Sequence, residues 1–261
     1  MSNINALAIR DTAQHPILPS PDEVAIITEG LADLDYVPYG TVKMPSGGMK
    51  AFNVTEAGND EADPQKPPFE AIIIHSHKQN SHFVGDMGDG QPPVCNSNDG
   101  VTGIETATGM RIACATCPYN QFGSGANGSK ACKNSRRLYL LRPGDIFPMV
   151  MNLPATGMRA YDQYAAKLIL NRKPVHGVLT SIGLKEAVNK GGIKYYAPTF
   201  DAKEALTPEA AAEIKAYAEK FVSAISRQPE PEPEPAQPQN YGYGEVPNSY
   251  KPVSNDEGLP F

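Results

Sequence analysis

The chain has 261 residues, 40% of them hydrophobic, which is enough to bury a core in one large or two small domains. It has no tryptophan but 25 prolines and 23 glycines, a composition that favours strands, loops and at least one unstructured segment. The formal charge is −6, and residues 228–261 hold six acidic residues against one basic residue. Residues 1–227 are therefore nearly neutral, and this asymmetry favours a nucleic-acid-binding or interaction role.

The first third of the chain predicts a loosely held arm followed by strands. The arm is polar and contains prolines through residue 21, and β-rich runs follow at residues 22–29 and 36–44. Residues 56–68 lack apolar periodicity, so an exposed loop is expected there. The apolar run at residues 69–76 predicts a buried strand.

All four cysteines lie in one stretch, at Cys95, Cys114, Cys117 and Cys132. A Cys-x-x-Cys pair can chelate one ion from a tight turn, and two further thiolates complete the tetrahedral set that zinc prefers. The spacing predicts a structural zinc site with four thiolate ligands, within a zinc-binding insertion of about residues 95–132. A catalytic zinc is disfavoured because four thiolates leave no open position for water.

Other uses of these cysteines remain open at this point. An iron–sulfur cluster also takes four thiolates. A redox pair at Cys114 and Cys117 would leave the other two cysteines unexplained. Two disulfides would suit a secreted protein, but the chain has no signal peptide and no apolar run of transmembrane length. We therefore expect a reduced, cytosolic protein without a membrane partner, in which unligated core cysteines are the last alternative.

The second half of the chain alternates strands and helices. Residues 136–141 and 146–153 predict strands, the second at a sheet edge or with a bulge because Pro148 cannot donate a hydrogen bond. Residues 175–184 and 193–200 flank a Gly-Gly turn and predict a hairpin.

Two helices are predicted on either side of this hairpin. Apolar residues repeat at helical spacing over residues 154–172, with Thr156 as the expected N-cap. A second helix runs from Thr207 to about residue 225, since Thr207-Pro208-Glu209 combines a capping hydroxyl, a proline and an acid in the first turn.

The element order predicts a mainly β protein of the α+β class. Five or more antiparallel strands interrupted by one helix fit an OB-like Greek-key barrel with an embedded zinc-binding loop, one inserted helix and a C-terminal helix. A generic α+β sandwich is the competing fold. We assign residues 1–226 to this core, 227–250 to a disordered Pro/Glu-rich linker and 251–261 to an acidic tip.

The last residues have the character of a peptide ligand. An apolar side chain and a terminal ring suit an apolar pocket, while neighbouring acids and the terminal carboxylate suit basic residues around it. The residues concerned are Asp256, Glu257, Leu259, Pro260 and Phe261.

This tip and its linker resemble those of the bacterial single-stranded DNA-binding proteins and their functional analogues in phages. The resemblance implies an OB-fold body that binds single-stranded DNA and a tip that recruits replication, recombination and repair proteins. It also implies the cytoplasm of a bacterial host, with a phage or mobile element as the source that fits best. The body shows no clear match to that family, and its four-cysteine site departs from the usual zinc-free members. Homo-oligomerisation is left open.

A single-strand-binding body needs cations for phosphates and aromatic rings for bases. Between residues 110 and 142 there are six basic residues, no acidic ones and interleaved aromatic rings. One or two of these cations would neutralise the negative charge of a four-thiolate zinc site, and the others would form a basic face. The predicted contacts are Lys78, Arg111, Tyr119, Phe122, Lys130, Lys133, Arg136, Arg137, Tyr139, Arg142, Lys194 and Tyr195.

Two other functions compete with DNA binding. The body could be a zinc-stabilised, protein-binding adaptor or transcription-associated factor. It could also be a thiol-dependent enzyme that uses Cys114 and Cys117. We expect no enzyme, because the sequence lacks a phosphate-binding glycine loop, a nucleophile elbow and a His-Glu-x-x-His motif.

Overall fold

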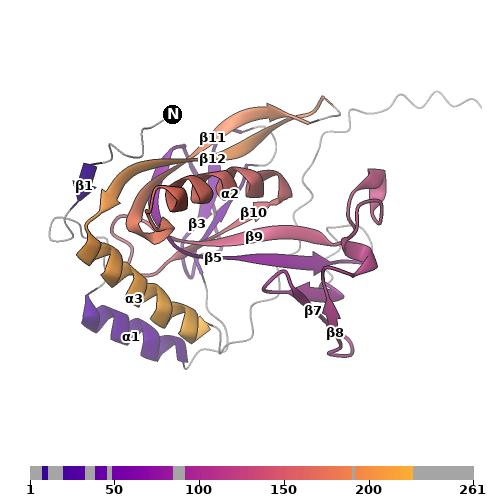
Figure 1. The fold of residues 1–261 in the computed structure, drawn as a ribbon, viewed down its shortest axis with the longest axis horizontal. Helices are drawn as coiled ribbons and strands as arrows, with labels where there is room; N and C mark the ends of the chain where they lie inside the picture. The colour runs from indigo at the N-terminus through magenta and orange to yellow at the C-terminus, as the bar shows by residue number, and fades with distance from the viewer. Residues whose placement is uncertain are drawn as a thin grey trace, which may run out of the picture.

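A computed structural model describes residues 8–10, 20–32, 39–45, 49–84, 92–189 and 192–225. This described part contains one sheet of 12 strands and three α-helices, so the protein is mainly β (Figure 1). The predicted linker and the acidic tip, with Asp256, Glu257, Leu259, Pro260 and Phe261, lie outside the described residues.

In the described ranges the elements follow one another along the chain with three short 3-10 turns between them. The helices are α1 Pro21–Ala32, α2 Ala155–Leu170 and α3 Pro208–Ile225, and the 3-10 turns are Pro118–Asn120, Ala126–Gly128 and Val175–Gly177. The strands are β1 Ala8–Arg10, β2 Thr41–Lys43, β3 Phe52–Thr55, β4 Asp63–Gln65, β5 Phe69–His82, β6 Cys95–Ser97, β7 Thr102–Glu105, β8 Arg111–Ala113, β9 Lys133–Leu141, β10 Met149–Pro154, β11 Val178–Val188 and β12 Lys194–Leu206.

The described strands form an open sheet rather than a closed barrel. Their order is β1-β12-β11-β5-β9-β10-β2-β3-β4, and β6, β7 and β8 branch from β5. The pairs β1–β12 and β2–β10 are parallel, while the other pairs are antiparallel. Helices pack against both faces, and this buries the sheet without closure.

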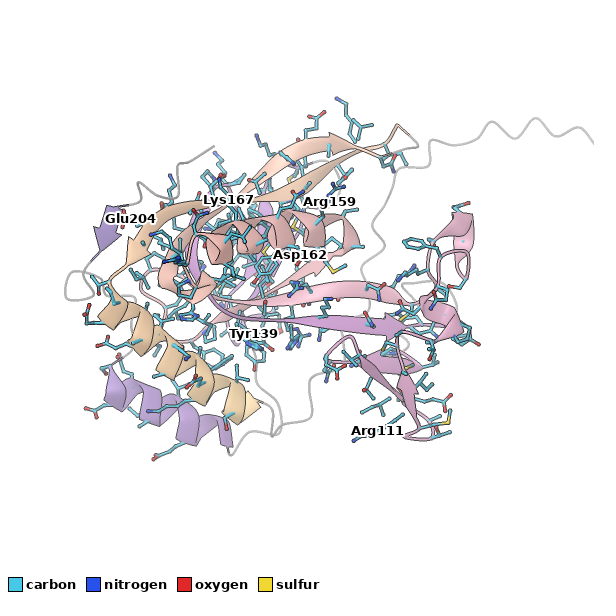
Figure 2. All side chains as sticks on the ribbon, viewed as in Figure 1. Arg111, Tyr139, Arg159, Asp162, Lys167 and Glu204 are labelled. Atoms are coloured by element: carbon cyan, nitrogen blue, oxygen red, sulfur yellow. The ribbon has the colours of Figure 1, made fainter. Side chains whose placement is uncertain are left out.

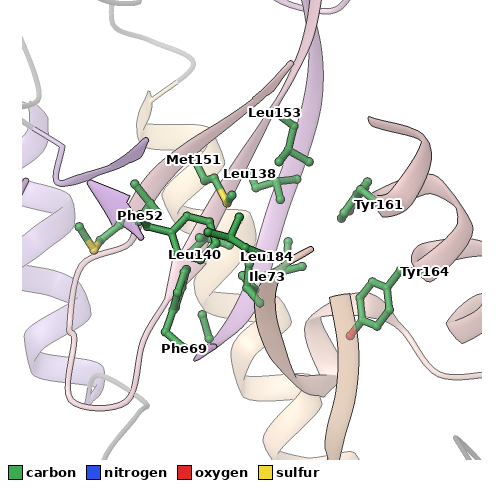
Figure 3. Close-up of a cluster of buried hydrophobic side chains, with 14 of the residues drawn as sticks. Phe52, Phe69, Ile73, Leu138, Leu140, Met151, Leu153, Tyr161, Tyr164 and Leu184 are labelled. Carbon is green, nitrogen blue, oxygen red and sulfur yellow. The ribbon is translucent and has the colours of Figure 1, made fainter. Parts of the chain in front are cut away.

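Side-chain alternation along the central strands builds two hydrophobic cores. On one face Ile73, Leu138 and Leu140 pack with Tyr161 and other residues of α2 (Figure 3). On the opposite face, strand residues pack with residues of α3. The strand residues are Ile72, Ile74, Tyr139, Leu141, Val150 and Leu179, and the helix residues are Ile214, Tyr217, Ala218 and Phe221. Both faces of the sheet centre are therefore removed from water.

The predicted second half of the chain is largely confirmed. Helices α2 and α3 form where apolar residues repeat at helical spacing. The Thr207 hydroxyl caps α3 by accepting a 3.2 Å bond from the Ala210 N–H. Strands β11 and β12 pair as the expected hairpin, in a register that runs from Val178↔Ala205 to Val188↔Lys194.

Four local predictions are wrong. Residues 56–68, expected to form a loop, contain the short strand β4, which pairs with β3. Residues 22–29 lie in helix α1, because Ser20 and Glu23 form a reciprocal capping box at its start. Pro21 is the first helical residue, a position that proline favours. Strand β10 starts after Pro148 and lies between β9 and β2, so the proline leaves the ladder intact and the strand is internal. Helix α2 takes its N-cap from Pro154, one residue before Ala155, instead of Thr156.

Strands β5 and β9 extend beyond the body as a long paired ribbon (Figure 1). The β5–β9 ribbon is paired from His75↔Tyr139 to Ser81↔Lys133. Helix α2 supports its base, where the Ser76 and Tyr161 hydroxyls lie 2.9 Å apart. The far end of the ribbon leads directly into the cysteine-containing stretch.

Candidate functional site

Residues 92–132, which we term the cysteine module, lie at the far end of the β5–β9 ribbon (Figure 1). Strand β6 extends the ladder of β5, with Cys95 opposite His82, and β7 and β8 add further antiparallel strands. The chain then forms two 3-10 turns and returns to the ribbon at Lys133. The sequence predicts a zinc-binding loop here, and the three short strands are not part of that prediction.

Each cysteine occupies a defined position in the module. Cys95 begins β6, and Cys114 follows β8 with its N–H bonded to the Val101 carbonyl at 2.8 Å. Cys117 closes the Cys-x-x-Cys turn, where its carbonyl accepts a 3.0 Å bond from the Asn120 N–H. Cys132 enters β9 while its N–H donates to the Tyr119 carbonyl at 2.8 Å. Backbone hydrogen bonds thus position the cysteines at the junctions between elements.

The thiols of Cys95 and Cys114 both lie close to Gly103. A Cβ atom at Gly103 would lie 2.8 Å from the Cys95 Sγ and 3.7 Å from the Cys114 Sγ. All four cysteines are free, and none is in a disulfide. Among the described residues, no group of three or more His, Cys, Asp or Glu side chains is arranged to hold a metal ion.

The surroundings keep two of these thiols protonated. Burial, followed by the three other cysteines, raises the pKa of Cys132 to about 11. Burial, followed by Cys114, Cys117 and Glu105, also raises the pKa of Cys95. The mutual effects show that the thiols lie within electrostatic reach of one another. Raised pKa values do not favour a thiolate nucleophile.

Amides join the module to the ribbon. The Asn134 amide donates to the side-chain oxygens of Asn80 and Asn120, and Asn80 donates to the Gly100 carbonyl at 3.2 Å. The Asn120 amide also donates to the Cys114 carbonyl at 2.8 Å, and Lys130 donates to the Asn120 side chain at 3.2 Å. This network connects the Cys-x-x-Cys turn to both ribbon strands.

Two exposed aromatic rings lie on the same part of the module. Tyr119 is 51% exposed and stacks on His82, with ring centroids 4.2 Å apart and an interplanar angle of 21°. Phe122 is 83% exposed, and the Lys130 ammonium lies 5.2 Å from its ring centroid. Both rings are therefore accessible to a further stacking partner. His82 is a site residue that the sequence analysis missed, because only strand pairing brings it to Tyr119.

The other predicted contact residues divide into three groups. Lys78, Arg111 and Lys133 are exposed on the module or on the adjoining ribbon. Arg136 and Arg142 are engaged with acids, at 3.2 Å from Asp162 and 2.9 Å from Glu56. Arg142 also binds Asp145 at 2.7 Å, so it stabilises a turn of the body.

The third group is buried or lies outside the module. Tyr139 is 1% exposed and Arg137 is 5% exposed, so neither side chain presents a surface for a nucleic acid. Lys194 and Tyr195 lie on the β11–β12 hairpin, where Lys194 pairs with Glu186 at 2.9 Å. Figure 2 shows Arg111 on the module and Tyr139 near the base of the ribbon. We therefore remove Tyr139 and Arg137 from the predicted surface.

Comparison with protein-family models, with curated proteins and with solved structures gives no match to this chain. None of the helices in the described ranges combines the length and the apolar character needed to cross a membrane.

Proposed function

We propose that the protein binds single-stranded DNA with little sequence preference and has no enzymatic activity. The observation that carries the proposal is the pair of exposed rings, Tyr119 and Phe122, beside the Lys130 ammonium. Unpaired bases stack on such rings whatever their identity, while lysine and arginine side chains hold the phosphates. Lys78, Arg111 and Lys133 supply further exposed cations on the same end of the molecule.

The proposal assigns binding to the cysteine module instead of to a barrel surface. The body contributes a rigid ribbon, since paired strands and the Ser76–Tyr161 contact position the module. The OB-like barrel of the resembling family is therefore not needed for this function. In the same proposal the acidic tip recruits replication, recombination and repair proteins in a bacterial cytoplasm, as the resemblance implies.

A titration of fluorescent oligo-dT followed by anisotropy tests the proposal. Replacing both rings, Tyr119→Ala with Phe122→Ala, removes two stacking faces, each worth about 1–3 kcal/mol. We expect binding to weaken about 30-fold or more, with little change in its salt dependence. The control is Val101→Ala, since Val101 is a 65% exposed apolar residue of the same module. Equal binding of wild type and the double variant would disprove the stacking surface.

A protein-binding adaptor is the second candidate, and one observation favours it. Val101, Ile104 and Met110 are large apolar side chains that are 48–65% exposed on the module. Such side chains suit a protein surface as well as a nucleic acid. Duplex DNA in the same titration separates the two functions, because an adaptor would show no preference for single strands.

A further inference from the structure

The cysteine module lacks the apolar core that holds the body together. Within residues 92–132, all of which the structure describes, the buried hydrophobic side chains are those of Cys114 and Cys132, at 6% and 7% exposure. Most of the larger apolar side chains of the same stretch, including Ile104 and Phe122, are exposed, and Ile112 is half-buried. A unit of roughly 40 residues without a core usually needs a cross-link to remain folded.

Cross-links of two kinds are available to four cysteines. A disulfide is one kind, but all four thiols are free in the structure. A metal ion held by thiolates is the other kind, and zinc sites with four sulfur ligands contribute folding free energy directly. Metal binding by the four cysteines would therefore give the module the stability that its apolar side chains do not provide.

Gly103 has an unusual place beside these thiols. Strand β7 alternates, so Thr102 and Ile104 point to one face while Gly103 lies on the other face, toward Cys95 and Cys114. Gly103 is buried, and an added methyl group would lie 2.8 Å from the Cys95 Sγ, which is closer than real contacts allow. Its backbone needs no positive φ, so packing rather than conformation favours glycine at this position.

We propose that Cys95, Cys114, Cys117 and Cys132 hold a zinc ion that replaces the missing core of the module, and that Gly103 leaves the room that the Cys95 sulfur needs to reach this ion. Zinc–sulfur bonds of about 2.3 Å would draw the four thiols together from their present, wider arrangement. Binding would release thiol protons, because the metal takes thiolates. The Asn120 amide, bonded to the Cys114 carbonyl, would fix the Cys-x-x-Cys turn around the ion.

The inference does not rest on the proposed DNA binding, and its test uses no DNA. The full-length protein is purified from zinc-supplemented cells, and its metal content is measured by elemental analysis beside its absorption spectrum. We expect one zinc per chain and no iron–sulfur absorption. A protein without zinc, or one with iron–sulfur absorption, would overturn the proposal.

The variant Gly103→Ala then tests the role of the glycine. In the metal-free protein the Cys95 side chain can rotate away from the new methyl group, so the body should melt as the wild type does. In the metal-bound protein the sulfur is fixed, and we expect zinc affinity to fall about 10- to 100-fold, as for other losses of positioning around a ligand. Zinc affinity is measured by competition with a chromophoric chelator.

Thr102→Ala is the matched control, since it changes the neighbouring residue on the opposite face of β7. We expect its zinc affinity to equal that of the wild type. Zinc removal by chelation should increase protease cleavage within residues 92–132 while the body remains protected. Unchanged zinc affinity in Gly103→Ala, or unchanged cleavage after chelation, would contradict the proposal.

Discussion

The body and the cysteine module stabilise their strands in different ways. In the body, helices cover both faces of the sheet, and residues such as Leu138 and Leu140 are fully buried. In the module, many apolar side chains face solvent, and side-chain amide hydrogen bonds join the segments that carry the four free cysteines. A single polypeptide thus combines a region held by the hydrophobic effect with one held by polar contacts and, in our proposal, a metal.

The largest expected effect comes from damage to the body. Leu140→Ala leaves a cavity next to Ile73 and Leu138, and we expect the free energy of unfolding to fall by about 2–5 kcal/mol. Urea unfolding followed by circular dichroism measures this loss. Zinc content and the protease protection of residues 92–132 should not change below the transition. A simultaneous loss of zinc would show that the two regions are not independent.

A smaller effect is expected where the ribbon leaves the body. Burial, and then the positive charges of Arg137, His75 and Arg136, lower the pKa of His77 from 6.5 to about 4. The folded protein therefore resists protonation of this ring, and the unfolded chain binds the proton first as pH falls. The contribution of His77 to the free energy of unfolding is fully present above pH 6.5 and is lost as pH falls toward 4.

The variant His77→Gln isolates this contribution. After allowance for the partial exposure of the ring, we expect about 2 kcal/mol of the acid-induced loss of stability to disappear. Urea unfolding at several pH values between neutrality and pH 4 gives the difference from wild type. His82 and His176 also have lowered pKa values and remain in both proteins, so their effects cancel. Identical pH profiles would show that His77 does not titrate in this way.

The smallest effect should be confined to the module. Asn134→Ala removes the amide that bridges Asn80 and Asn120, and leaves their oxygens without that donor. We expect local opening of the module to become easier by about 1–2 kcal/mol, as measured by amide hydrogen exchange. Asn98→Ala is the control, because Asn98 makes an exposed side-chain bond in the same module. Faster exchange throughout the body would contradict a local role.

Sequence reasoning found the elements whose signals are local. The cap at Thr207, the helical spacing of α2 and the β11–β12 hairpin are all readable over short windows. The prediction of a strand in place of α1 was wrong. The β-branched residues at positions 24–28 favour a strand, but the Ser20–Glu23 capping box starts a helix. The open sheet was also beyond local patterns, because strand order depends on which distant segments pair.

The candidate site follows the same division. Cysteine spacing gathers the four thiols in one module, and exposed positions such as Lys133 follow from composition. Arg136 and Arg137 are adjacent, however, and only the register of β9 decides which of them is buried. His82 and Gly103 had no sequence signal. Strand pairing brings His82 to Tyr119, and the place of Gly103 depends on how closely the Cys95 sulfur approaches β7.

The register of the ribbon has a further consequence. Ser81 and Lys133 are the last residues of β5 and β9 to pair with each other, so the chain leaves and re-enters the ladder at neighbouring points. The intervening stretch therefore occupies the place that a two-residue turn takes in an ordinary hairpin. In architectural terms, the cysteine module is an insertion grafted onto a hairpin tip, and its chemistry can vary without altering the framework that carries it.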